Sequence, residues 1–254
     1  MNLFLPDNFI GYILERALPE GLFNKVSYIK SGDLAVHAEH NPDDVFLAPT
    51  LDLNGKKEIY VSGKAAAIID MEISTGFMYY SGKEVDELRK AGIAGDICKQ
   101  DIILAKLLFN ELYGSDPELK IVSAGDWGDL NALILFGNEN FSDDRFTAGV
   151  PWSDEITELL DSSFVQYSFA SNNVDSLKLL NSYADYIDET AVKIKLNFLK
   201  ERKYGRESQK YIFDSLNYLN FKMTPDDVES FTNLVRLPFL AGIYKDVWEF
   251  RMID

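Results

Sequence analysis

The stretch that decides the fold is GIAGDICKQDIILAKLLFNELYG, residues 92–114. It opens with a short apolar run containing two glycines, and from Ile102 to Leu112 apolar side chains recur at helical spacing. Gly114 stands where a helix often ends on a left-handed residue. The stretch therefore predicts a strand, a tight turn over residues 96–101 and a helix. The start of that helix exposes unpaired N–H groups and is a ready site for an anion.

Units of the same kind lie on both sides of this stretch. The alternation of apolar and polar residues, with turn residues between the runs, separates strands from helices. Strands are predicted at residues 25–30, 45–48, 58–61, 65–69, 73–80, 92–95, 121–124, 130–136 and 164–170. Helices are predicted at residues 9–18, 31–40, 85–90, 98–112, 151–160 and from Thr224 onward, and the chain after residue 171 reads as mainly helical.

Two strand-like runs, near residues 72–80 and 164–170, flank a central α/β block. Two lobes joined by two crossing strands give this pattern, with a ligand cleft between the lobes. We therefore predict an α/β fold with mixed sheets flanked by helices and a helical C-terminal region. Lobe 1 is predicted to comprise residues 1–73 and 171–254, and lobe 2 residues 74–170.

The composition excludes some classes of partner. The 254 residues carry 41 acidic and 25 basic side chains, for a formal charge of −16. Nucleic-acid binding depends on clustered Lys and Arg, so no nucleic-acid partner is expected. A locally positive cleft in such a chain can still receive a small anion.

Targeting and redox signals point to the cytoplasm. Cys98 is the only cysteine, so no intrachain disulfide can form. The first twelve residues, MNLFLPDNFIGY, lack the pattern of a secretory signal. No apolar run approaches the roughly 20 residues that cross a bilayer. The sequence thus predicts a cytoplasmic protein with no membrane partner, and it leaves the oligomeric state open.

Several short strings, in their order along the chain, resemble the menaquinone-biosynthesis family of the futalosine route, to which chorismate dehydratase belongs. They are Asp44–Thr50 (DVFLAPT), Ile73–Ser81 (ISTGFMYYS), Ala94–Leu108, Leu130–Asn138 (LNALILFGN), Phe164–Ala170 (FVQYSFA) and Leu219–Ile243. The resemblance implies the type II periplasmic-binding-protein fold. It also implies a carbon–oxygen lyase role in menaquinone biosynthesis, acting on a small carboxylate.

The resemblance further implies where a ligand lies. Asn8 is the remnant of the family's N-terminal motif and is the candidate catalytic residue, orienting the substrate. Thr50 ends one matching strand, and Asn138 stands where the family has an aspartate. Both are candidate ligand-binding residues.

One departure bears on catalysis. The family has a Ser/Thr pair at the start of the second-lobe helix, where this sequence has Cys98, Lys99, Gln100 and Asp101. Lys99 and Gln100 can bind an anion through charge and amide N–H groups, or form an ordinary solvated first turn. Cys98 is either an activated thiolate or a small buried apolar residue. A long ammonium replaces two short hydroxyl donors poorly, so chorismate dehydration is expected to be weak or absent.

Ser74, Thr75 and Gly76 lie on the predicted crossing strand. Glycine there admits a ligand close to the backbone, or simply bends the strand. All three are candidate ligand-binding residues.

No motif for a cofactor is present, and none is predicted. His37 and His40, spaced i, i+3 beside acidic residues, form too weak a pattern for a metal site. The predicted function is binding of a small anionic organic ligand, with lyase activity left undecided. The alternatives are a non-catalytic binding or sensing module on the same scaffold, and a solute-binding protein.

Overall fold

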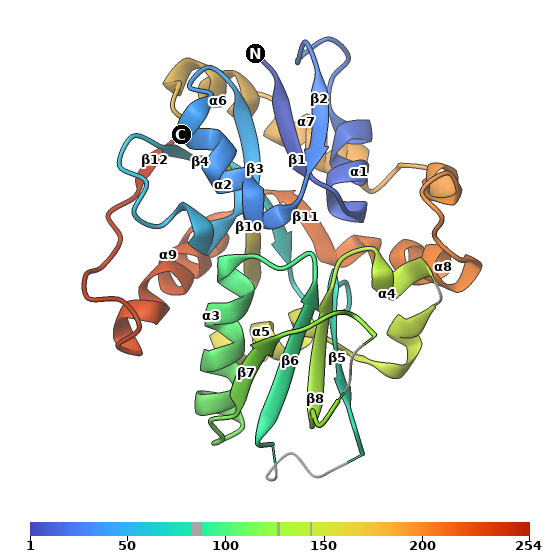
Figure 1. The fold of residues 1–254 in the computed structure, drawn as a ribbon. Helices are drawn as coiled ribbons and strands as arrows, with labels where there is room; N and C mark the ends of the chain where they lie inside the picture. The colour runs from blue at the N-terminus through green and yellow to red at the C-terminus, as the bar shows by residue number, and fades with distance from the viewer. Residues whose placement is uncertain (83–87, 126–127, 143) are drawn as a thin grey trace.

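The computed structural model describes residues 1–82, 88–125, 128–142 and 144–254. It contains two sheets, each flanked by helices, one above the other in Figure 1. The helices are α1 (Phe9–Ala17), α2 (Ser31–His40), α3 (Lys99–Leu107), α4 (Glu139–Ser142), α5 (Trp152–Leu160), α6 (Val174–Asn181), α7 (Ala184–Ala191), α8 (Arg206–Asp214) and α9 (Pro225–Leu240). Short 3₁₀ turns occupy Thr50–Leu53, Arg145–Ala148, Leu196–Lys200 and Leu216–Tyr218, and a π-helical turn follows α3 at Leu108–Leu112.

The first sheet contains both ends of the chain. Its described strands follow the order β11-β4-β10-β3-β1-β2, and β12 pairs with another part of β4. They are β1 (Leu3–Pro6), β2 (Val26–Ile29), β3 (Val45–Pro49), β4 (Tyr60–Ile69), β10 (Phe164–Ser171), β11 (Leu219–Lys222) and β12 (Arg251–Ile253). Strand β1 runs parallel to β2 and β3, whereas β10 is antiparallel to both β3 and β4. We call the elements around this sheet lobe 1.

The second sheet is formed by the middle of the chain and defines lobe 2. Its described strands follow the order β7-β6-β8-β5-β9. They are β5 (Gly76–Tyr80), β6 (Lys90–Gly95), β7 (Glu118–Ile121), β8 (Ala132–Phe136) and β9 (Val150–Pro151). Strand β8 is buried along its whole length and β6 along all but its two end residues, as expected for a sheet covered on both faces.

The lobe boundary differs from the prediction at one end. Strand β10 was expected to close lobe 2 at residue 170, but it lies between β3 and β4 in the first sheet. The chain therefore crosses back before residue 164, between α5 and β10. The apolar residues of β10 predict a buried strand. Only the pairing of β10 with β3 and β4 shows to which sheet it belongs.

Local chemistry explains where the main helices begin and end. Asn8 caps α1, because its side-chain oxygen accepts the N–H groups of Ile10 and Gly11. Thr224 caps α9 in a capping box with Asp227, at the helix start predicted from the sequence. Gly114 adopts the left-handed conformation, with φ of +57°, after the π-helical turn.

Other differences from the sequence are small. The predicted strands 58–61 and 65–69 are one strand, β4, and the strand predicted at 121–124 lies at 118–121 as β7. Half of the predicted helix at 85–90, residues 85–87, falls outside the described residues, and the other half is not helical, since Lys90 begins β6. Strands β11 and β12 lie in the C-terminal region that was expected to be helical. The sequence did not reveal them, because both form their hydrogen bonds by pairing with the distant strand β4. Among the helices that the structure describes, none is long and apolar enough to span a membrane.

Candidate functional site

The two lobes meet where the starts of α2 and α3 approach each other. Gly32, in the first turn of α2, packs against the backbone of lobe 2: a Cβ atom added there would lie 2.8 Å from the carbonyl oxygen of Ile97. A side chain at this position would push the lobes apart. The absence of a side chain therefore permits the close contact.

The start of α3 in lobe 2 holds a carboxylate from lobe 1. The N–H groups of Lys99 and Gln100 donate to the two carboxylate oxygens of Asp52, at 3.1 and 2.7 Å. Asp52 lies on the 3₁₀ turn that follows β3 and is buried. The anion site predicted at this helix start is therefore occupied by the protein's own side chain.

The start of α2 in lobe 1 holds a carboxylate from lobe 2 in the same way. Asp96, at the end of β6, accepts the backbone N–H of Ser31 at 3.0 Å and the Ser31 hydroxyl at 2.7 Å. Each lobe thus supplies the carboxylate that caps a helix of the other lobe. We call this pair, Asp52 on α3 and Asp96 on α2, the reciprocal carboxylate contact.

Burial sets the electrostatics of this contact. It raises the pKa of the Asp52 carboxyl, and the N–H groups of Gln100 and Lys99 oppose that rise. Burial also raises the pKa of Asp96, against the two hydrogen bonds from Ser31. Removing a carboxylate from water is unfavourable unless donors replace the water, and the helix N–H groups do so here.

The side chain of Gln100 links the lobes a second time. Its oxygen accepts the N–H of Leu51 at 3.0 Å, and its nitrogen donates to the carbonyl of Gln166 at 3.0 Å. The Gln166 amide nitrogen donates to Thr75 Oγ1 at 2.9 Å. The amide oxygen of Gln166 is buried and has no hydrogen-bond partner among the described residues. Thr75 and Gln100, both predicted ligand-binding residues, therefore lie in one buried polar network. The Gln166 amide oxygen is an unused hydrogen-bond acceptor of that network.

Tyr167 fills the space between the starts of α1 and α2. Its hydroxyl accepts from Asn8 Nδ2 at 3.0 Å and lies 3.3 Å from the Ser31 hydroxyl. Asn8, the predicted catalytic residue, is therefore both the cap of α1 and a partner of Tyr167. Thr50, at the start of the 3₁₀ turn after β3, is buried against β10. Its hydroxyl donates to the carbonyl of Val165 in that strand at 2.7 Å.

Asn138, in lobe 2, forms a further polar contact with lobe 1. Its amide nitrogen donates to the Asp7 carbonyl at 2.9 Å and to the Tyr12 hydroxyl at 3.1 Å. The Tyr204 hydroxyl donates to the Asn138 oxygen. Beside this contact the ring of Phe9 in α1 packs edge-on against an aromatic ring of lobe 2, Phe141, with centroids 5.6 Å apart. Polar and aromatic contacts together hold the lobes closed.

Cys98 does not have the surroundings of an activated thiol. It is buried, and its Sγ lies 3.1 Å from a carboxylate oxygen of Asp101, which also accepts the Cys98 N–H at 2.9 Å. Burial raises the pKa of the Cys98 thiol well above its ordinary value, and the charges of Asp101 and Asp52 raise it further. Burial likewise raises the pKa of Asp101 to about 7. This geometry fits the interpretation of Cys98 as a small buried residue.

Ser74 and Gly76 are engaged in local structure. The Ser74 hydroxyl donates to the Gly76 carbonyl at 2.6 Å and accepts the N–H of Ser153 at 3.1 Å. A Cβ atom on Gly76 would lie 2.5 Å from the ring of Phe136. Packing between β5 and β8 therefore accounts for the glycine. Lys99 differs from these residues, because its side chain points out of the interface, with Nζ 4.9 Å from the centre of the Tyr244 ring.

Within the described part of the chain, no group of three or more His, Cys, Asp or Glu is placed to hold a metal ion. His37 stacks on Phe4 at the lobe 1 sheet, with ring centroids 5.8 Å apart.

No protein-family model matches the sequence, and no curated protein matches it. Solved structures do match, over nearly the whole chain. The alkanesulfonate-binding protein SsuA from Xanthomonas axonopodis pv. citri has a TM-score of 0.65 at 8% identity, covering 98% of this chain and 95% of its own. The Candida albicans CA3427 gene product, which has the generic periplasmic binding protein fold, has a TM-score of 0.60 at 12% identity, covering 97% and 91%. The aliphatic sulphonate binding protein SsuA from Escherichia coli gives 0.59 at 10% identity, covering 100% and 93%.

The fold is that of the periplasmic binding proteins. The fold class predicted from the sequence is therefore confirmed. Small-molecule sites occur preferentially at interfaces between domains, and the reciprocal carboxylate contact lies at such an interface.

Sequence reasoning missed the residues that close this site. Asp52, Asp96, Tyr167 and Gln166 were not among the candidates, although Asp96 lies inside the stretch that decides the fold. A polar residue directly after a buried strand was the available signal, since Asp96 follows β6 and Asp52 follows β3 by a few residues.

Proposed function

We propose that this protein binds a small organic anion, in the simplest case a carboxylate, between its two lobes. The observation that carries the proposal is the reciprocal carboxylate contact, in which Asp52 and Asp96 each sit on a helix start of the opposite lobe. Donors that hold one carboxylate in this geometry can hold another. A ligand carboxylate takes the place of either side chain when the lobes separate.

The chemistry of the surroundings agrees with this proposal. Thr75 and Gln166 supply hydroxyl and amide groups in a buried place, where hydrogen bonds to an organic ligand are strong. The unpartnered oxygen of Gln166 accepts a hydrogen bond from a ligand hydroxyl or amine. Two of the structural neighbours are named for binding aliphatic sulfonates, which are organic anions.

Carboxylate binding is tested by removing one of the internal carboxylates. Asp52→Ala leaves the N–H groups of Lys99 and Gln100 without their partner. In a thermal-shift screen with chorismate, futalosine derivatives and simple carboxylates, the best probe should bind Asp52→Ala about tenfold more tightly than the wild type, a difference of about 1.4 kcal/mol.

The matched control is Glu229→Ala, which removes one exposed carboxylate from α9 and should leave probe affinity unchanged. If no probe stabilises either the wild type or Asp52→Ala, the lobes do not serve as a carboxylate site.

A chorismate dehydratase-like lyase is the second candidate, and the family resemblance favours it. Elimination of water needs a base at one proton and donors at the substrate carboxylates. The position of the family's hydroxyl pair is taken here by Lys99 and Gln100, whose side chains are committed to Tyr244 and to the Leu51 and Gln166 backbone. We therefore expect binding without dehydration. Turnover of chorismate by purified protein on the order of 1 per second would favour the lyase instead.

A further inference from the structure

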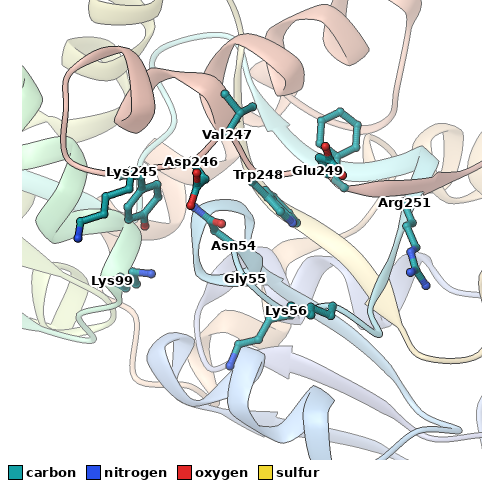
Figure 2. Close-up of a pocket in the computed structure, with 13 residues that line it drawn as sticks. Asn54, Gly55, Lys56, Lys99, Lys245, Asp246, Val247, Trp248, Glu249 and Arg251 are labelled. Carbon is teal, nitrogen blue, oxygen red and sulfur yellow. The ribbon is translucent and has the colours of Figure 1, made fainter.

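A second hollow, separate from the reciprocal carboxylate contact, lies beside the boundary between the lobes. It has a volume of about 960 Å³ and is bounded by residues 54–57, by residues 244–251 and by Lys99 at the start of α3. Figure 2 shows Lys99 and Lys245 at one end and Arg251 at the other, with the loop of Asn54 and Lys56 facing the C-terminal segment. We call it the basic groove. Its volume lies at the upper end of the range for small-molecule sites, roughly 300–1,000 Å³.

The charge of the basic groove is opposite to that of the chain. The chain as a whole has a formal charge of −16. The residues that bound the groove include five bases, Lys56, Lys57, Lys99, Lys245 and Arg251, against two acids, Asp246 and Glu249. Bases collected in one hollow of an acidic protein create a local field that favours an anion.

Most of these bases have no ion-pair partner. Lys56 pairs with Glu39 at 2.8 Å. Among the described residues, Lys57, Lys99, Lys245 and Arg251 form no ion pair with an acidic side chain. Four positively charged side chains of the groove are therefore available to a ligand.

The groove also offers aromatic surface and a donor. Lys99 Nζ lies over the ring of Tyr244. The Tyr244 hydroxyl is buried and has no hydrogen-bond partner among the described residues. Trp248 is held in place by Phe231 and Phe250, with ring centroids 6.2 and 5.8 Å away. A fixed aromatic wall beside unpaired bases suits a ligand with a planar body and a strongly charged end.

We propose that the basic groove binds a phosphate monoester, with its phosphate between Lys99, Lys57 and Lys245 and its organic part against Tyr244 and Trp248. Lys99 belongs to lobe 2, whereas the other two bases lie in lobe 1 and the C-terminal segment. A phosphate held by both sides stabilises the closed arrangement of the lobes. This site goes beyond the carboxylate site proposed above, because neither Asp52 nor Asp96 lines the groove.

The test measures affinity by thermal shift and by the fluorescence of the protein's tryptophans. The probes are phenyl phosphate, adenosine monophosphate and glucose 6-phosphate, with adenosine and inorganic phosphate as their uncharged and inorganic counterparts. We expect at least one ester to bind more tightly than both counterparts. Lys245→Glu and Lys57→Glu should each weaken that ester about tenfold or more.

Lys210→Glu is the matched control, because it makes the same charge change on an exposed position of α8, and it should not alter affinity. Equal weakening by Lys210→Glu, or binding that survives both groove substitutions, would overturn the proposal, as would a failure of every ester to bind. The two proposed sites can be told apart. Asp52→Ala should change carboxylate affinity alone, and Lys245→Glu should change phosphate-ester affinity alone.

Discussion

Charged groups differ between two regions of the molecule, the reciprocal carboxylate contact and the basic groove. Between the lobes, the carboxylates of Asp52 and Asp96 are withdrawn from water and satisfied by helix N–H groups. In the groove, which Lys99 at the start of α3 also lines, Lys57 and Lys245 are exposed and form no ion pair among the described residues. Lys99 belongs to both regions, since its backbone serves the first and its side chain the second.

This difference shows how one helix start can serve two purposes. Backbone donors bind a carboxylate within the protein, and such buried contacts are strongly coupled to stability. Exposed side-chain charges contribute little to stability and remain available to a ligand. Substitutions in the first region should therefore change the free energy of unfolding, and those in the second should change binding. The predictions below test that division in order of expected effect.

The largest effect is expected for Tyr167→Ala, which removes a buried ring between the starts of α1 and α2. Loss of a large buried side chain costs about 3–5 kcal/mol of unfolding free energy. Chemical denaturation measures it. Tyr244→Ala, the same change in the basic groove, should cost clearly less because that ring is only partly buried. Equal losses would show that the two regions do not differ.

The next effect depends on pH. Burial raises the pKa of Asp101 from 3.8 to about 7, so between these values the folded state binds more protons than the unfolded state. Stability must then fall as pH rises through this window. From pH 5 to pH 8 the loss from this residue is about 3 kcal/mol, at 1.36 kcal/mol for each pKa unit. Asp101→Asn should flatten the pH dependence by that amount, as measured by chemical denaturation at each pH. An unchanged pH dependence in Asp101→Asn would contradict this prediction.

A smaller effect is expected for Gly32→Ala. The new Cβ would meet the Ile97 carbonyl at 2.8 Å, so the lobes must shift. Overpacking of this kind costs about 2 kcal/mol. It should also speed proteolysis at the crossing near residues 70–75. Gly125→Ala enters open space and serves as the control. If both variants unfold at the same denaturant concentration, the lobes are not in tight contact at α2.

The smallest effect separates capping from ligand binding at Asn8. Asn8→Ala and Asn173→Ala each remove the cap of a helix, α1 and α6, and each should cost about 1 kcal/mol. Only Asn8→Ala should also weaken the best carboxylate probe, because Asn8 lies at the lobe contact with Tyr167. Unchanged affinity would leave Asn8 as a plain helix cap.

The sequence by itself determined the elements that have a local cause. Alternating and helical patterns located β3, β8, α2 and α9, and the caps at Asn8 and Thr224 lie within three residues of the N–H groups they serve. Gly114 could be read as a left-handed position because that conformation is a property of one residue. The order of these elements, with a block inserted between two crossings, predicted a two-lobed α/β fold, and the family resemblance implied its periplasmic-binding-protein type.

Only the tertiary structure decided which groups meet between the lobes. Asp52 and Gln100 are separated by 48 residues, Ser31 and Asp96 by 65, and Asn8 and Tyr167 by 159. No periodicity or spacing encodes such pairs, because a hydrogen bond depends on distance in space and the intervening chain can follow many paths. For the same reason β10 joined the first sheet rather than closing the second. The anion site at α3 was visible in the sequence, but the carboxylate that fills it came from the other lobe.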